Sequence, residues 1–150
     1  MNQTIVFEIQ AVLDRDTKNL PGSPAIADTI LEKISRANLF IADITLVTKS
    51  KRPSSNPNVL IELGYAAAKI GWERVICVLN DAFGEPRKLP FDLQHRRWPI
   101  RYNLSENATK GEIVKTKDSL SKEFELAIRS AIQSGVIVNV THPKDRRVAV

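Results

Sequence analysis

A single carboxylate, Glu62, stands in an otherwise apolar segment that runs from Asn56 to Gly71. Asn56 can cap a helix whose first residue is Pro57 or Val59, and a glycine at the far end can close it. Residues 59–68 carry no other charge, so we expect most faces of this helix to be buried. Glu62 is therefore either part of the wall of a binding pocket or a half-buried group satisfied by local hydrogen bonds.

The surroundings of Glu62 on the predicted helix favour an ionised carboxylate. It lies one to two turns from the positive end of the helix dipole. Asn58, Tyr65, Ala66 and Lys69 share its face by helical spacing. An amide and a small residue beside a carboxylate are more typical of a pocket than of a solvated surface.

Composition indicates an ordinary globular domain. The chain has 150 residues, of which 43% are hydrophobic and 26% charged, which predicts one domain with a real core. We expect a cytoplasmic location, because no apolar run could span a bilayer and the N-terminus does not resemble a secretory signal. The single cysteine, Cys77, excludes an internal disulfide, and with His95 and His142 it has no spacing typical of a metal site.

The net charge of +5 is modest, and its basic clusters are spread along the chain. These clusters are explained by solvated loops, and a weak preference for ligands that carry phosphate is the alternative explanation. We expect no membrane partner and no specific nucleic acid.

Strand and helix patterns alternate along the chain. The predicted strands are 4–13, 38–44, 74–79 and a short one near 98–102, and the predicted helices cover about 24–37, 57–70 and 112–134. This order predicts an α/β fold with an open parallel sheet and helices on both faces. The domain is expected to span residues 1–135, with 136–150 as a C-terminal strand or tail.

Polar residues follow the predicted strands and open the Glu62 helix. They are Asp14, Arg15 and Asp16, then Asp43, then Asn80 and Asp81, and finally Asn56 and Asn58 at the helix start. In open parallel sheets, ligands bind beyond the carboxyl ends of the strands, so we expect these residues to lie at one edge. Each has an alternative role as a turn or cap residue, and we favour that role for Asn80 and Asp81.

Four segments of the sequence together form a recognisable pattern. They are Asp14-Arg15-Asp16-Thr17 with Pro21-Gly22-Ser23-Pro24, then Phe40-Ile41-Ala42-Asp43-Ile44, then Asn56-Pro57-Asn58-Val59-Leu60-Ile61-Glu62-Leu63-Gly64-Tyr65-Ala66, and Leu89-Pro90-Phe91-Asp92-Leu93. This pattern resembles the bacterial TIR-like predicted nucleotide-binding proteins. The resemblance covers about residues 5–130, and its most specific part is the block around Glu62.

The resemblance implies a flavodoxin-like fold. Catalytic TIR domains cleave the nicotinamide glycosidic bond of NAD with a glutamate on their third helix, which corresponds to Glu62. The loop 14–23 would match a mobile loop that shapes the active site and assembly contacts, so a homo-oligomer or filament and a role in antiviral defence are implied. Nucleoside 2-deoxyribosyltransferases carry a similar Glu-Leu-Gly-Tyr-Ala block, in which the glutamate attacks the sugar.

The chemistry of N-glycosidic cleavage explains the need for such a carboxylate. The transition state is oxocarbenium-like, and a carboxylate beside the anomeric carbon stabilises or captures it. Nicotinamide in NAD is already cationic and leaves without a proton, whereas a neutral base needs a general acid, here Asp14, Asp16 or Asp43. We therefore favour NAD hydrolysis, with NAD as substrate and no other cofactor. The alternatives are nucleoside transfer and a catalytically silent nucleotide-binding or oligomerisation module.

The predicted roles are thus Glu62 in catalysis and a group of polar residues in substrate binding. That group is Asp14, Arg15, Asp16, Asp43, Asn56, Asn58 and Tyr65.

One part of the family pattern has no counterpart in the sequence. TIR-like proteins have a strand and helix before the strand predicted at 4–13, and that first strand is central in the sheet. The chain is expected to lack this unit, so either the sequence is a truncated form, or the strands predicted at 4–13 and 38–44 pair directly, or another segment fills the gap. The apolar run Val136–Val140 is a candidate to fill its place, and the alternative is that this run is a frayed tail.

Overall fold

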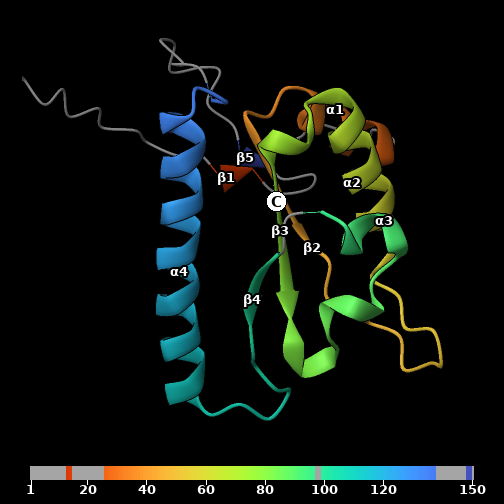
Figure 1. The fold of residues 1–150 in the computed structure, drawn as a ribbon, viewed down its shortest axis with the longest axis vertical. Coiled ribbons are helices and arrows are strands. Elements are labelled where there is room, and N and C mark those ends of the chain that lie inside the picture. The colour runs from red at the N-terminus through yellow and green to blue at the C-terminus, as the bar shows by residue number, and fades with distance from the viewer. Residues whose placement is uncertain (1–12, 15–25, 97–98, 138–147, 150) are drawn as a thin grey trace, which may run out of the picture.

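The computed structural model describes residues 13–14, 26–96, 99–137 and 148–149, which form a parallel sheet with helices packed on it (Figure 1). The sheet order is β1-β5-β2-β3-β4. The strands are β1 (Leu13–Asp14), β2 (Leu39–Asp43), β3 (Val75–Asn80), β4 (Ile100–Tyr102) and β5 (Val148–Ala149). All of the described pairings between these five strands are parallel, so the predicted open α/β sheet is confirmed.

Helices cover both faces of this sheet. The helices α1 (Ile26–Ser35), α2 (Pro57–Lys69) and the short α3 (Phe91–Gln94) lie on one side, and α4 (Lys110–Gln133) lies on the other (Figure 1). Short 3-10 turns at Trp72–Arg74, Asp81–Phe83 and Pro86–Lys88 complete the connections around β3. The described residues therefore form the three layers expected of a parallel α/β fold.

Strand β5 occupies the position between β1 and β2. Val148 pairs with Leu13 of β1 and with Leu39 of β2. The order equals the flavodoxin-like order 2-1-3-4-5 when β5 stands where the first strand would be. The candidate for this position was Val136–Val140, but Val136 and Ile137 lie in a bend after α4, and 138–140 are outside the described residues.

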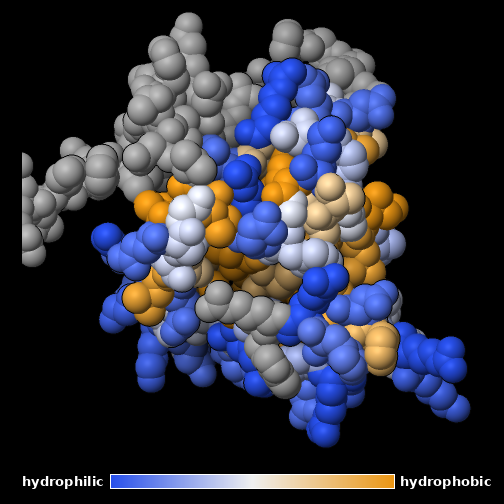
Figure 2. All heavy atoms as spheres, turned by 45° about the horizontal axis from the view of Figure 1, so that its top comes forward, coloured by the Kyte–Doolittle hydropathy of each residue, from blue (hydrophilic) through white to orange (hydrophobic). Residues whose placement is uncertain are grey.

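The main core lies between the sheet and the helices α1 and α2. Phe40 and Ala42 of β2 point to this side and pack with Leu63 of α2, and all three are at most 3% exposed. The expectation that most faces of α2 are buried is wrong, because α2 is an outer layer and contacts the sheet along one face. Ile61 is 66% exposed, and hydrophobic residues are visible on the surface among hydrophilic ones (Figure 2).

Gly84 follows η2 (Asp81–Phe83) in a backbone conformation that favours glycine, with φ of 149°. A Cβ added there would lie 2.5 Å from Cδ1 of the buried Leu46. We expect Gly84→Ala to lower the free energy of unfolding by about 1–3 kcal/mol, measured by urea denaturation. The control is Gly111→Ala in α4, where an added Cβ meets no atom within 4 Å. Equal stability of the two variants would contradict the close contact with Leu46.

A capping box fixes the start of α4. The Thr109 amide and hydroxyl both donate to Oε2 of Glu112 at 2.7 Å, and the Thr109 hydroxyl accepts from the Glu112 amide at 3.3 Å. These hydrogen bonds lower the pKa of Glu112 below its ordinary value of 4.5. The folded state therefore holds fewer protons here than the unfolded chain at acidic pH.

This lowered pKa predicts a pH dependence of stability. The contribution of Glu112 is present above pH 4.5 and is lost as the pH falls through the lowered pKa of the folded state. We expect the free energy of unfolding to fall more steeply with acid in the wild type than in Glu112→Gln. Urea unfolding between pH 3 and pH 6 measures both slopes, and parallel curves would contradict the assignment.

Candidate functional site

The N-terminus of α2 forms as its sequence predicts. Asn56 caps the helix, and its side-chain oxygen accepts a hydrogen bond of 2.9 Å from the Asn58 amide. Pro57 is the first helical residue, where its missing N–H costs nothing. Gly71 follows the helix with φ of 89°, a conformation that suits glycine. Because α2 follows the parallel strand β2, its N-terminus lies toward the carboxyl edge of the sheet.

Glu62 lies on the border between the core and solvent. Its side chain is half-buried, whereas the next residue, Leu63, is 2% exposed, and Ala66 one turn later is 0% exposed. Asn58 on the same flank is exposed, and Tyr65 is half-buried and packs against the core. Glu62 can thus be reached from solvent while apolar residues flank it, and this arrangement strengthens an electrostatic contact with a bound ligand.

Asp43 closes β2 and points to the opposite face of the sheet from α2. Its neighbours Ala42 and Ile44 pack into the core on the α2 side, and successive strand residues alternate between faces. Its exposed carboxylate accepts two hydrogen bonds at Oδ1, from the amide of Thr45 at 3.0 Å and from its hydroxyl at 2.6 Å. The structure therefore places Asp43 and Glu62 on different sides of the sheet.

The side chain of Asn80, at the end of β3, forms hydrogen bonds with Leu104 in the segment that follows β4. Asn80 is 4% exposed, and its side chain donates to the carbonyl of Leu104 at 2.8 Å. The same side chain accepts from the amides of Ala82 and Leu104 at 3.1 and 3.0 Å. The next residue, Asp81, forms an ion pair of 2.9 Å with Arg101. The hydrogen bond with Ala82 caps the turn Asp81–Phe83 and confirms the turn role that we favoured for Asn80 and Asp81, while the contacts with Leu104 and Arg101 are additional.

Tyr102, the last residue of β4, is part of this edge and was not singled out from the sequence. Burial raises the pKa of its phenol, the Asp43 carboxylate raises it further, and hydrogen bonds with Thr45 and Asn80 lower it. The phenol therefore stays protonated and can donate a hydrogen bond near Asp43. Its position at the end of a predicted strand was the available signal.

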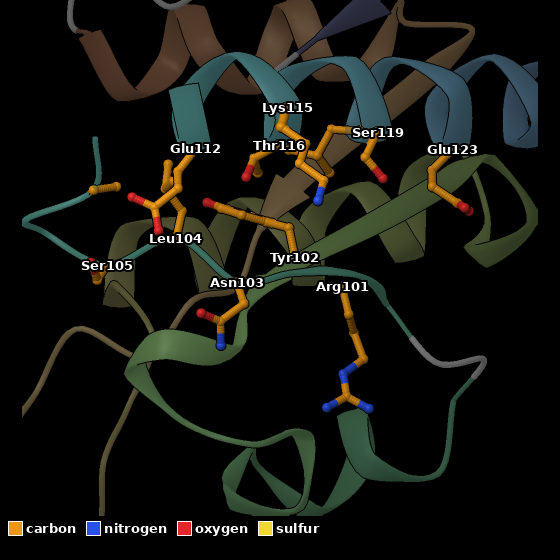
Figure 3. Close-up of a pocket in the computed structure, with 12 residues that line it drawn as sticks. Arg101, Tyr102, Asn103, Leu104, Ser105, Glu112, Lys115, Thr116, Ser119 and Glu123 are labelled. Atoms are coloured by element: carbon orange, nitrogen blue, oxygen red, sulfur yellow. The ribbon is translucent and has the colours of Figure 1, made fainter. Parts of the chain in front are cut away.

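A cavity of about 370 Å³ opens between β4 and the first half of α4 (Figure 3). Among the residues that the structure describes, the side chains that surround it come from two segments. They are Arg101, Tyr102, Asn103, Leu104, Ser105 and Ala108 from β4 and the loop after it, and Glu112, Lys115, Thr116, Ser119, Leu120 and Glu123 from α4. Glu62 is not among them, because α2 packs on the other face of the sheet.

The loop from β2 to α2 presents a basic tip. An antiparallel bridge between Leu46 and Ser55 closes the loop, and Ser55 is fully buried with its hydroxyl donating 2.6 Å to the carbonyl of Ile44. Its tip exposes the cations Lys49, Lys51 and Arg52. Between Asp43 and Glu62 the chain has no acidic residue, so this loop carries only positive charge.

The structure describes only one of the three predicted binding residues after the first strand. Asp14 is the last residue of β1, at the carboxyl end of that strand, and Arg15 and Asp16 lie outside the described residues. In the described part of the chain, no group of three His, Cys, Asp or Glu residues could hold a metal ion. No helix within those residues is both long enough and apolar enough to cross a membrane.

Comparisons with family models, curated proteins and solved structures find no match for this chain.

Proposed function

We propose that this protein hydrolyses the bond between nicotinamide and ribose in NAD, with Glu62 as the catalytic carboxylate. The observation that carries the proposal is the placement of Glu62 on the second turn of α2, half-exposed and beside the capped N-terminus. The choice of NAD cleavage as the reaction rests on the resemblance to TIR-like proteins. An effector role in antiviral defence and activation by self-assembly rest on that resemblance alone.

The proposed step needs one carboxylate and one water. As the bond from C1′ to the ring nitrogen breaks, its electron pair goes to nicotinamide, which leaves as a neutral molecule. The oxocarbenium ion that remains is stabilised by the Glu62 carboxylate and is then attacked by water, which gives ADP-ribose and releases a proton. Such stabilisation of developing charge is worth roughly 10²–10³ in rate.

The position of Asp43 bears on the choice between NAD and a nucleoside with a neutral base, because it removes one of the three candidates for a general acid. A neutral base needs a proton from a general acid close to the attacking or stabilising carboxylate. Asp43 was one candidate for that acid, but it projects from the other face of the sheet, away from α2. A cationic leaving group requires no such acid.

The basic tip of the loop before α2 supports a substrate with phosphates. Lys49, Lys51 and Arg52 are exposed and precede the helix that carries Glu62. A diphosphate bound between this tip and the α2 N-terminus would be favoured by both charge and helix dipole. A silent nucleotide-binding module would use the same contacts, so turnover has to be measured.

Incubation of the purified protein with NAD, followed by chromatography of nicotinamide and ADP-ribose, tests the proposal directly. The concentration series should extend to high protein, because self-assembly can be required for activity. Release of nicotinamide supports NAD hydrolysis. Exchange of bases between nucleosides without NAD turnover would replace it with a transferase, and silence with saturable NAD binding would indicate the binding module.

A further inference from the structure

The cavity between β4 and α4 is separate from Glu62 and has the size of a small-ligand site. Its volume of about 370 Å³ falls in the range of about 300–1,000 Å³ that is usual for such sites. It lies on the α4 side of the sheet, whereas α2 covers the other side (Figure 1). A ligand bound here would therefore not contact the α2 helix.

Five polar side chains of α4 line this cavity, with Lys115, Thr116 and Ser119 in the middle and the carboxylates of Glu112 and Glu123 at the two ends (Figure 3). Lys115, Thr116 and Ser119 extend from the helix toward β4, and the ring of Tyr102 lies across the space that they face (Figure 3). Lys115 and Ser119 are four residues apart, so they sit one turn apart on the same side of α4. Together the three residues offer an ammonium group and two hydroxyls to one ligand.

Lys115 is the cation that remains available to a ligand. Of the two cations that line the cavity in the described part of the chain, Arg101 donates to Asp81 through Nε at 3.0 and 2.9 Å and points away from the α4 side (Figure 3). Lys115 forms no ion pair with any residue that the structure describes. The nearby Glu112 has its Oε2 engaged by two hydrogen bonds from Thr109.

Apolar groups face the Lys115 side of the cavity, and the remaining polar groups of the lining are Asn103, Ser105, Glu112 and Glu123. Leu104, Leu120 and the Tyr102 ring are half-buried, and Ala108 leaves room beside them. A flat ring could stack on Tyr102 and contact the two leucines. The middle of the cavity therefore sets one ammonium group and two hydroxyls against an apolar side, while the carboxylates of Glu112 and Glu123 lie at its ends, and this middle part fits a nucleoside that carries one phosphate.

We propose that the cavity binds a nucleoside monophosphate. Its phosphate contacts Lys115 and the hydroxyls of Thr116 and Ser119, and its base lies against Tyr102. The site differs from the Glu62 site in face and in residues, so it provides a place for a second nucleotide that regulates or accompanies the proposed reaction. It does not depend on that reaction.

The test is a titration of the ¹⁵N-labelled protein with adenosine monophosphate, followed by NMR. We expect saturable shifts of the amides of residues 102–105 and 115–120. Lys115→Gln should raise the apparent Kd for adenosine monophosphate by about 10- to 100-fold, because a charge-assisted hydrogen bond is lost. Lys117→Gln, an exposed lysine of the same helix that does not line the cavity, is the matched control and should bind as the wild type does.

Two comparisons make the outcome decisive. Adenosine, which lacks the phosphate, should bind the wild type more weakly than adenosine monophosphate and should bind wild type and Lys115→Gln equally. Glu62→Gln should leave the shifts at residues 102–105 unchanged, whether or not Glu62 is catalytic. The proposal is overturned if no saturable shift appears at the cavity, or if Lys115→Gln and Lys117→Gln bind adenosine monophosphate with the same affinity.

Discussion

Glu62→Gln is expected to reduce nicotinamide release from NAD by roughly 10³-fold while the protein stays folded. Glutamine keeps the size of the side chain but removes the negative charge that, in the proposed reaction, faces the developing oxocarbenium ion. The half-buried position of Glu62 at the edge of the core means that the neutral amide can be accommodated. Initial rates at saturating NAD measure the effect, and the thermal unfolding midpoint checks the fold.

The matched control for this variant is Glu106→Gln. Glu106 is an exposed carboxylate in the loop before α4, far along the chain from α2. It should retain the wild-type rate. Glu62→Asp, which keeps the charge but withdraws it by one methylene, should retain a measurable fraction of activity. Equal rates for Glu62→Gln and wild type would exclude Glu62 as the catalytic carboxylate.

Asn80→Ala is expected to lower the free energy of unfolding by roughly 2–4 kcal/mol. The substitution removes three hydrogen bonds of a side chain that is 4% exposed. It leaves the amide and carbonyl of Leu104 and the amide of Ala82 without their partner. Urea denaturation with an unchanged m-value would measure the loss.

Asn103→Ala provides the comparison for that variant. Asn103 directly follows β4 at the same carboxyl edge of the sheet, but it is exposed. Its replacement should change the stability by no more than about 0.5 kcal/mol. If both variants unfold at the same urea concentration, the network around Asn80 does not hold the two strand ends together.

The elements with strong periodicity could be predicted from the sequence. The strand predicted at 38–44 is Leu39–Asp43, and the helix predicted around Glu62 is Pro57–Lys69. Both have several apolar residues in a clear pattern and a recognisable end. The position of β5 could not be predicted, because Val148–Ala149 is two residues long and has no period to detect. The run at 136–140 has more consecutive apolar residues and was therefore the stronger strand candidate.

The candidate site was predictable only in part, for a geometric reason. Spacing along the chain identifies the strand end at Asp43 and the cap at Asn56, since these signals are local. The face of the sheet from which Asp43 projects depends on how β2 packs against the helices. Asp43 projects from the face opposite α2 and is therefore separated from Glu62. Tyr102 interacts with Asp43 and Thr45 although these residues are far apart in the sequence, so no local sequence pattern could predict the contact.

The pairing of β5 with both β1 and β2 constrains the order in which the protein can be assembled. Leu13 and Val148 are partners although almost the whole chain separates them. During synthesis, β2 and β3 can pair as soon as both have left the ribosome, whereas β1 has no described neighbour until residues after α4 emerge. Because distant pairings form slowly, the edge that holds β1 is expected to close last, after the core around α2 has formed.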